Sequence, residues 1–345
     1  MTIKVGINGF GRIGRLVTRA ISEYNIDDVQ IVAINSPGNL ETSAHLLKYD
    51  SVHGRFQEQV TTGEGFMMIG DNKVRMTHER NPADINWGEL DVDVVMECSG
   101  VFRTKERAMP HIEAGAKSIL ISAPADGVDK TIVYGVNHQE LAAADLIVSN
   151  ASCTTNCLAP VAKVLDEALG IVRGTVNTVH AMTGDQAIID ARHNDPRRGR
   201  AAAESLVPTS TGAAKAIGEV LPQLAGRLHG TAVRVPTATV SMIDLVFNSG
   251  KRTTVEEVNA LFAAAAQDPA MGGALAYNDR LLVSVDFKGH PASAIFDATQ
   301  TSVLDGDMVR VVAWYDNEWA FAERMIDTAA SMMALRAETN LKQAA

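Results

Sequence analysis

The chain has 345 residues, of which 46% are hydrophobic and 21% charged, a balance typical of a globular protein long enough for two domains. Its formal net charge of −10 argues against nucleic acid as a main partner, because binding of phosphate backbones requires clustered Lys and Arg. No apolar run reaches the roughly 18 residues of a membrane span, no signal-peptide pattern opens the chain, and three cysteines cannot form a disulfide framework. We therefore expect a cytoplasmic protein without membrane attachment.

The first half of the chain alternates short apolar strands with helices. We expect a helix at 14–24 and strands at 3–8, 29–35, 92–98, 118–122 and 146–149. Strands that alternate with helices in this way form a mostly parallel sheet with helices on its faces. The pattern therefore predicts a Rossmann-type, doubly wound α/β fold for this half.

After about residue 150 the pattern changes. A helix is expected from Cys153 to about Leu169, followed by long alternating strands and a C-terminal helix from residue 318. Long strands in succession predict an α+β domain with a mixed or antiparallel sheet. We expect a dinucleotide-binding domain at 1–150 that includes the C-terminal helix at 318–345, and a catalytic domain at 151–317.

A glycine-rich loop follows the first expected strand. Gly9, Gly11 and Gly14 form the pattern GxGxxG between a strand and a helix. In this context Gly9 permits a tight turn, Gly11 lets the backbone approach a pyrophosphate, and Gly14 allows close packing of the helix on the strand. The helix N-terminus would stabilise the phosphate charge. The alternative is a glycine-rich turn that binds no ligand.

The acid that usually binds the adenosine ribose is missing. Its position, about 20 residues beyond the glycines, is occupied by Ser36. An Asp there would bind the 2′-hydroxyl of NAD and repel the 2′-phosphate of NADP, whereas a serine can donate a hydrogen bond to a phosphate. The alternative is that Ser36 is a neutral loop residue and that other contacts hold NAD.

The segment SNASCTTNC, residues 149–157, places Cys153 between the end of a strand and the start of a helix. A helix N-terminus favours the thiolate, so we expect a lowered thiol pKa for Cys153, whereas Cys98 fits an inert buried thiol. Cys157 lies one turn further on, but no other Cys or His stands at ligand spacing, and no metal site is predicted. His180, at the end of an apolar strand, is the candidate base, although spacing alone does not show that it meets Cys153.

Five motifs extend over most of the chain: NGFGRIGR, SNASCTTN, PTSTGAAKAIGEVLPQL at 208–224, VRVPT at 233–237 and WYDNEW at 314–319. Together they resemble the phosphorylating glyceraldehyde-3-phosphate dehydrogenases, from residue 3 to about 333. The resemblance implies conversion of D-glyceraldehyde 3-phosphate to 1,3-bisphosphoglycerate with NAD(P) and inorganic phosphate. It also implies a thiohemiacetal and a thioester on Cys153, His180 as base, and a homotetramer.

The resemblance assigns further residues to three sites. For the cofactor it adds Asn8, Arg12, Ile13, Asn35, Arg80, Ser99, Gly100, Ser122 and Asn317 to the three glycines. For the substrate phosphate it implies Thr183, Asp185, Arg198 and Arg234. For the attacking phosphate it implies Ser152, Thr154, Thr211 and Gly212. Arg234, in an apolar strand, could instead form a structural ion pair, and Arg198 could belong to a solvated basic loop.

The chain departs from the family pattern at the cofactor and after the histidine. NAD-specific members carry Asp in place of Ser36 and a Leu-Pro pair that reaches the ribose of a neighbouring subunit, where this chain has Ala191 and Arg192. Loss of an acid and gain of a cation favour NADP, used exclusively or alongside NAD. Family members often have Ser-Tyr where Ala181 and Met182 follow the histidine here.

Two rival functions remain open at this stage. Erythrose-4-phosphate dehydrogenases share the cysteine chemistry with a longer substrate, but their second phosphate site departs from the pattern that residues 208–212 keep here. A non-catalytic binding protein of the same fold, recruited for nucleic acid or cell-surface contacts, is the more remote alternative. Intact candidate catalytic residues and phosphate sites argue against it.

Overall fold

The computed structural model describes residues 2–344, with side chains to residue 339, and divides into two compact units. The first unit comprises 2–132, His138–Ala151 and 322–344, and the second comprises Val133–Asn137 and Ser152–Phe321. This division differs from the expected domains chiefly in the short segment Val133–Asn137 and at the start of the C-terminal helix. Residue 345, which we placed in that helix, lies outside the described residues.

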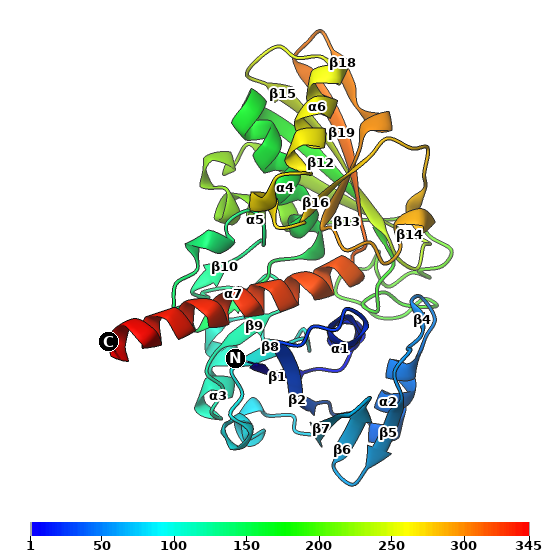
Figure 1. Ribbon diagram of the computed structural model, residues 1–345. Coiled ribbons are helices and arrows are strands. Elements are labelled where there is room, and N and C mark those ends of the chain that lie inside the picture. Colours follow the sequence, from blue (N-terminus) through cyan, green and yellow to red (C-terminus); the bar gives the residue numbers. More distant parts are fainter. Residues whose placement is uncertain (1, 345) are drawn as a thin grey trace. The chain divides into compact units, whose positions relative to one another are not determined.

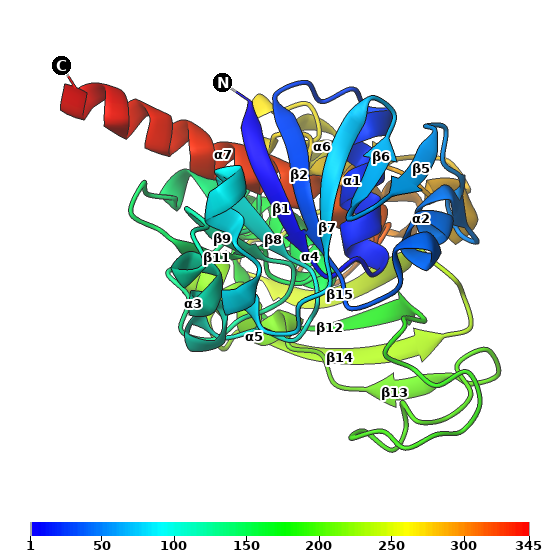
Figure 2. The same cartoon turned by 90° about the horizontal axis from the view of Figure 1, so that it is seen from below.

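The first unit is built on a nine-stranded sheet in the order β10-β11-β9-β8-β1-β2-β7-β6-β5, and Figure 2 shows β1, β2, β7 and β8 side by side. Its strands are β1 (Ile3–Asn8), β2 (Val29–Asn35), β5 (Val60–Gly63), β6 (Phe66–Ile69), β7 (Asn72–Thr77), β8 (Val94–Glu97), β9 (Ile119–Ile121), β10 (Lys130–Thr131) and β11 (Ile147–Ser149). A small hairpin joins β3 (Tyr49–Asp50) to β4 (Gly54–Arg55). The helices are α1 (Arg12–Glu23), α2 (Leu40–Lys48), α3 (Lys105–Glu113) and most of α7 (Trp319–Ala344).

Seven neighbouring strands of this sheet, from β10 to β7, run parallel, while β6 and β5 extend it as an antiparallel hairpin that we did not predict. The predicted strands near 92–98 and 118–122 are present but shorter. The chain runs from β1 to β2 on one side and later places β8 on the other side of β1, so a topological switch point lies at the carboxyl ends of β1 and β8. In open α/β sheets this is where ligands bind.

The C-terminal helix α7 packs on the first unit. Within that unit Arg336 donates hydrogen bonds to the carbonyl oxygens of Lys117 (2.6 Å) and Asp145 (3.0 Å), and Thr328 donates one to Asn150 (2.9 Å). Within residues 2–344 no helix combines the length and the apolarity needed to cross a lipid bilayer.

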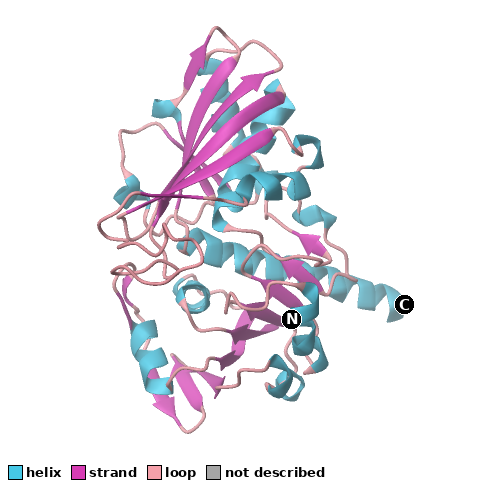
Figure 3. Cartoon of the chain, turned by 180° about the vertical axis from the view of Figure 1, so that it is seen from behind, coloured by secondary structure: helices cyan, strands magenta, loops and turns pink. Residues whose placement is uncertain are grey.

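The second unit contains an eight-stranded mixed sheet in the order β13-β14-β12-β15-β19-β17-β16, with β18 paired to β19; its long strands are magenta in Figure 3. The strands are β12 (Ile171–Ala181), β13 (Val207–Thr209), β14 (Leu228–Val235), β15 (Ser241–Ser249), β16 (Leu275–Asn278), β17 (Ala294–Asp297), β18 (Ser302–Leu304) and β19 (Met308–Tyr315). The helices are α4 (Cys153–Leu169), α5 (Ala213–Val220) and α6 (Val255–Ala265).

Helix α4 covers the middle of this sheet, where it contacts β12, β15, β17 and β19 (Figure 1). Residues of β15 alternate strictly between buried and half-buried, as expected for a sheet with one face packed against helices. The parallel first sheet and the mixed second sheet confirm the predicted fold class.

Candidate active site

Cys153 is the first residue of α4 and follows a strained turn. Ala151 has a φ of +56°, a left-handed conformation that is unfavourable for a residue other than glycine. The side chain of Ser152 then caps the helix by accepting a hydrogen bond from the backbone N–H of Thr155 at 3.0 Å. Strain of this kind is concentrated at functional sites.

His180, near the end of β12, lies beside this thiol. Its Nε2 is 3.5 Å from the Sγ of Cys153, and its Nδ1 is 2.7 Å from the carbonyl oxygen of Ala181. A carbonyl oxygen can only accept, so Nδ1 carries the proton and Nε2 presents its lone pair to the thiol. The structure therefore brings the two candidate residues together in the tautomer that a general base requires.

Burial controls the protonation of this pair. Burial raises the pKa of the Cys153 thiol, although Arg234 and the amide of Thr154 act in the opposite direction. The lowered pKa expected from the helix N-terminus is therefore not found, because desolvation outweighs it. Burial, reinforced by Arg234, also lowers the pKa of His180 to about 3, so the imidazole is neutral and free to accept a proton.

Tyr315, on β19, ties the start of α4 to β12. Its hydroxyl is hydrogen-bonded to the hydroxyls of Thr154 and Thr178, both at 2.9 Å, and its ring meets the His180 ring edge-on with 5.9 Å between centroids. Tyr315 is almost fully buried, with 1% of its surface exposed. One buried side chain thus joins residues close to Cys153 and His180 in the chain. The Thr154 hydroxyl, which we expected at the attacking phosphate, already has a protein partner.

Arg234 is the cross-strand partner of His180 in the parallel pairing of β12 with β14. Its Nη1 donates to the hydroxyl of Thr183 at 3.0 Å and to the carbonyl of Ala181 at 3.3 Å. Its Nε is buried without a protein partner, and among the described residues it has no ion pair. The Nε–Nη2 edge of the guanidinium, which binds oxyanions in a bidentate manner, is therefore open. The structural ion pair considered as an alternative is not found.

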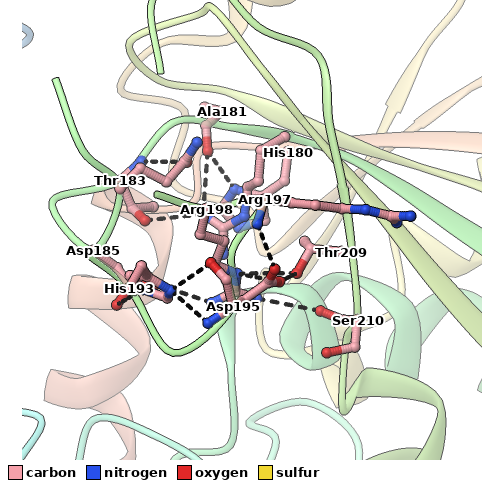
Figure 4. Close-up of polar contacts among 12 residues, drawn as sticks. His180, Ala181, Thr183, Asp185, His193, Asp195, Arg197, Arg198, Thr209 and Ser210 are labelled. Carbon is pink, nitrogen blue, oxygen red and sulfur yellow. Dashed lines mark hydrogen bonds and ion pairs between the residues drawn. The ribbon is translucent and has the colours of Figure 1, made fainter. Parts of the chain in front are cut away.

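Arg198 is held in a network of side chains on the loop between β12 and β13 (Figure 4). It donates to the Asp185 carboxylate at 2.9 Å, to the Thr209 hydroxyl at 3.0 Å and to the Ser210 carbonyl at 3.3 Å. Asp195 accepts a hydrogen bond from Thr209 at 2.6 Å. Although burial opposes it, the hydrogen bond to Arg198 keeps the pKa of Asp185 below its ordinary value. Arg198 therefore has a fixed orientation, unlike a residue of a solvated loop.

The residues expected at the second phosphate site lie at two helix starts. Ser152 precedes α4, and Gly212 is the N-cap of α5, where Thr211 accepts a hydrogen bond from the N–H of Ala213 at 3.2 Å. A Cβ atom added to Gly212 would meet no atom within 4 Å. Helices α4 and α5 contact each other. Helix starts favour anions, but no hydrogen bond among the described residues joins the two pairs.

In the first unit, the glycine loop has the geometry of a pyrophosphate-binding turn. Gly9 has a φ of +94°, and a Cβ atom there would lie 2.5 Å from the backbone of Ser99. A Cβ on Gly14 would collide with the Gly9 carbonyl, whereas one on Gly11, the N-cap of α1, would meet nothing within 4 Å. The open face of Gly11 at a helix start fits a dinucleotide phosphate.

A buried polar chain connects the strand ends around this loop. The Asn8 amide donates to Glu97, and its Oδ1 accepts from Asn35 at 2.7 Å; Asn35 in turn accepts from Thr77 at 2.8 Å. Glu97 also accepts from the Ser99 N–H at 2.7 Å. These contacts fix two of the expected cofactor residues, Asn8 and Asn35, beneath the switch point.

Ser36 follows Asn35 and is 9% exposed. Its carbonyl accepts a hydrogen bond from Nδ1 of His78 at 2.8 Å, and the His78 imidazole is exposed. Arg80 is exposed, Ser122 is half-buried, and Gly100 has a φ of +72° in the turn after β8. Ile13 lies in the first turn of α1.

Two expected cofactor residues belong to the second unit. Asn317 is 5% exposed, and its Oδ1 accepts from the Ser241 hydroxyl at 2.9 Å, which leaves its amide N–H groups to donate. Ser241 also accepts the N–H of Ala181 at 3.0 Å. Arg192 is exposed, and among the described residues it has no ion pair.

Arg12, in the first turn of α1, forms an ion pair with Asp50, whose side chain is 2% exposed. The Asp50 carboxylate also accepts from the N–H groups of Val52 and His53, both at 2.9 Å. Although burial opposes it, the hydrogen bond from Arg12 lowers the pKa of Asp50 to about 2. The pair joins the glycine loop to the β3–β4 hairpin.

We expect Asp50→Asn to lower the free energy of unfolding by about 2 kcal/mol at pH 7. Because the folded pKa lies below the unfolded one, the stabilisation is complete above about pH 5 and is lost as the pH falls through the folded pKa. Urea unfolding of both proteins between pH 7 and pH 3 measures the difference. A difference that stays constant with pH would contradict the ion pair as its source.

Comparisons with known proteins decide the family. A family model described as "Glyceraldehyde 3-phosphate dehydrogenase, NAD binding domain" matches residues 3–105, and one described as "Glyceraldehyde 3-phosphate dehydrogenase, C-terminal domain" matches 152–317. Proteins named glyceraldehyde-3-phosphate dehydrogenase from Cereibacter sphaeroides and Geobacillus stearothermophilus are 56% and 52% identical to the chain. Each alignment covers 96% of this chain, and 99% and 98% of the two relatives, respectively.

The chain belongs to the glyceraldehyde-3-phosphate dehydrogenase family. A relative from Xanthobacter flavus with the same name is 54% identical over 96% of the chain and 99% of its own length. The resemblance inferred from motifs is thereby confirmed, and so is a nicotinamide-binding domain of this dehydrogenase family. Among residues 2–339, whose side chains the structure describes, no cluster of three His, Cys, Asp or Glu side chains is suited to a metal ion.

Sequence reasoning missed several side chains that contact the expected site residues: Asp50, His78, Glu97, Thr209, Ser241 and Tyr315. Glu97 carried a signal, since a charged residue inside the apolar run VVMEC is costly to bury without partners. Ser241 carried none, because its contacts depend on partners from other elements. Tyr315 lies in the WYDNEW motif, but the motif does not indicate its partners Thr154 and Thr178.

Proposed function

We propose that this protein oxidises D-glyceraldehyde 3-phosphate with NAD(P) and inorganic phosphate to 1,3-bisphosphoglycerate. The observation that carries the proposal is the Cys153 thiol 3.5 Å from Nε2 of His180, with the tautomer set by Ala181. The expected result is aldehyde oxidation by purified protein that requires both NAD(P)⁺ and phosphate. Absence of turnover in the complete mixture would overturn the proposal.

In the proposed mechanism, Nε2 of His180 takes the proton of Cys153 as the sulfur attacks the aldehyde carbon to form a thiohemiacetal. The backbone N–H groups at the start of α4 stabilise the developing oxyanion. His180 returns this proton to the oxyanion to give the thiohemiacetal hydroxyl, and it would take the proton back in the oxidation, for which a bound nicotinamide would supply the hydride acceptor. The resulting thioester is attacked by inorganic phosphate, and the acyl phosphate leaves Cys153 as thiolate.

The two phosphate groups are proposed to bind in the second unit. The open edge of Arg234, the fixed guanidinium of Arg198 and the Thr183 hydroxyl suit the substrate phosphate, with Asp185 orienting Arg198. The starts of α4 and α5, with Ser152 and Thr154 at one and Thr211 and Gly212 at the other, suit the attacking phosphate. Because Thr154 is already bonded to Tyr315, we assign its backbone rather than its hydroxyl to this role.

For the cofactor, we propose that NADP is accepted, exclusively or alongside NAD. Asn8, Arg12, Asn35, Arg80, Ser99, Gly100, Ser122 and Asn317 would hold the dinucleotide with the glycine loop. Ser36 offers no carboxylate to repel a 2′-phosphate, and its hydroxyl can donate a hydrogen bond to that group. Arg192, with Ala191 beside it, supplies a free cation, proposed to act from a neighbouring subunit.

We expect Ser36→Asp to raise KM for NADP⁺ about tenfold or more and to lower KM for NAD⁺, because a carboxylate repels the 2′-phosphate and accepts the 2′-hydroxyl. The measurement is kcat/KM with each cofactor at saturating aldehyde and phosphate. If the wild-type protein strongly prefers NAD⁺, the assignment of Ser36 and Arg192 to NADP is wrong.

Apolar side chains on two loops of the second unit support association between copies of the chain. The exposed fractions reach 85% for Ile188, 78% for Ile189 and 91% for Leu281, and Leu206, Val283 and Val285 are also exposed. Large apolar groups gathered on loops mark interfaces. The family resemblance, rather than these side chains, supports four copies.

We expect Ile188→Glu/Ile189→Glu to shift the sedimenting species to a smaller assembly, since two buried carboxylates per copy would oppose association. Analytical ultracentrifugation at micromolar concentration measures the change. An unchanged tetramer would place the interface elsewhere, and a monomeric wild-type protein would overturn the proposed assembly.

Assays with erythrose 4-phosphate, with and without inorganic phosphate, test the nearest alternative. A preference for that aldehyde together with phosphate-independent hydrolysis would favour an erythrose-4-phosphate dehydrogenase. Inactive protein that binds RNA would favour the non-catalytic alternative. A cytoplasmic location stays a prediction from cysteine content.

A further inference from the structure

Buried hydrogen-bond donors without a protein partner gather near Thr183. Nε2 of Gln186 is one of them, in a side chain that is only 8% exposed. Nε of Arg234 and the hydroxyl of Thr237 are two others among the described residues. Unpaired buried polar groups are rare in folded proteins because each loses its hydrogen bonds to water. Several at one place indicate an acceptor that the chain itself does not supply.

Hydrogen bonds tie the three residues that carry these donors to one segment of the chain, residues 182–186. Gln186 closes the turn twice, since its N–H donates to the Thr183 carbonyl at 3.0 Å and its Oε1 accepts the Thr183 N–H at 3.2 Å. Arg234 donates to the Thr183 hydroxyl at 3.0 Å, and the N–H of Met182 donates to the Thr237 carbonyl at 3.0 Å. Because Oε1 is occupied, Nε2 is the end of the Gln186 amide that remains unpaired.

Gln186 is also adjacent to Arg198. The preceding residue, Asp185, binds the Arg198 guanidinium at 2.9 Å, and the N–H of the following residue, Ala187, donates to the Arg198 carbonyl at 3.3 Å. Figure 4 shows Thr183, Asp185 and Arg198 gathered at one point of this loop. Two guanidinium groups and an unpaired amide around one turn select an oxyanion with several acceptor oxygens.

We propose that Nε2 of Gln186 donates a hydrogen bond to the phosphate group of the aldehyde substrate, beside Arg234 and Arg198. The inference deepens the proposed function and rests on it. A glutamine suits this position because its Oε1 accepts the N–H of Thr183 while its Nε2 donates to the phosphate. A glutamate could also accept the N–H of Thr183, but its charge would repel the phosphate.

The test compares Gln186→Glu and Gln186→Met with wild type on two aldehydes, D-glyceraldehyde 3-phosphate and unphosphorylated D-glyceraldehyde. We expect Gln186→Glu to raise KM for the phosphorylated aldehyde by about 10- to 100-fold and Gln186→Met by about tenfold, since charge-assisted hydrogen bonds are lost. With the unphosphorylated aldehyde, kcat/KM should stay within about twofold of wild type. Gln300→Glu, a change of the same charge at an exposed position, should alter neither substrate.

Each other outcome overturns the inference. Equal losses with both aldehydes would assign Gln186 to the turn alone, and an effect confined to KM for inorganic phosphate would assign it to the other anion site. Gln186→Glu keeps the acceptor for Thr183, so circular dichroism should show a folded protein; unchanged KM in that variant would exclude a donor role. A wild-type protein without preference for the phosphorylated aldehyde would overturn the proposed function, and this inference with it.

Discussion

Replacement of His180 with asparagine is expected to lower kcat by about 10²- to 10⁴-fold, the range for loss of a general base. The reason is geometric: Nε2 of His180 is 3.5 Å from the Cys153 sulfur, and burial together with Arg234 keeps the imidazole neutral. Initial rates with saturating aldehyde, NAD(P)⁺ and phosphate measure the effect. The alkylation rate of Cys153 by iodoacetamide should fall as well, because no neighbouring base then accepts the thiol proton.

His229 provides the matched control, since it is an exposed histidine on β14. We expect His229→Asn to keep both rates. A His180→Asn variant with kcat within a few-fold of wild type would contradict the role of His180 as base. A loss of turnover without any change in alkylation would instead restrict His180 to the later proton transfers.

Replacement of Arg234 with glutamine is expected to lower kcat/KM for D-glyceraldehyde 3-phosphate by about 10²- to 10³-fold, because it removes the proposed bidentate contact of the guanidinium with the substrate phosphate. The same change should slow alkylation of Cys153 at neutral pH. Arg234 lowers the pKa of the thiol, so its removal raises that pKa and reduces the thiolate fraction. Steady-state kinetics and iodoacetamide alkylation at pH 7.5 measure the two effects.

Two further variants separate charge from geometry. Arg234→Lys keeps the charge without the planar fork, so alkylation should recover while much of the loss in kcat/KM remains. Arg173→Gln removes an exposed cation from β12 and should change neither quantity. If Arg234→Gln lowers kcat/KM equally for unphosphorylated glyceraldehyde, Arg234 acts on the thiol alone.

The residues that could be predicted from sequence each carry a local signal. Cys153 stands among hydroxyls at a strand-to-helix turn, and Arg234 is a charge in an apolar strand, which is costly without an anionic partner. The glycine loop likewise follows a strand and opens a helix. For such residues a short stretch of sequence is enough to suggest a functional role, and the structure adds the distances and contacts.

The remaining features depend on register and pairing across long separations. His180 faces Arg234 because β12 and β14 pair in parallel with one particular register, and Thr154 meets Tyr315 across 161 residues. No local pattern specifies either contact. The antiparallel β5–β6 extension of the first sheet was missed for a similar reason, since its strands are only four residues each. The pKa of Cys153 was misjudged because desolvation depends on the packing of distant residues.

The carbonyl of Ala181 accepts hydrogen bonds from both His180 and Arg234, and it belongs to the main chain. No substitution at position 181 other than one that distorts the backbone can delete this acceptor. The side chains at 181 and 182 therefore need no role in setting this tautomer. Ala181 and Met182 can stand where family members often have Ser and Tyr without removing the acceptor. The hydrogen-bond acceptor that fixes the tautomer of His180 is therefore kept when side chains change, so the side chains around it can vary in sequence.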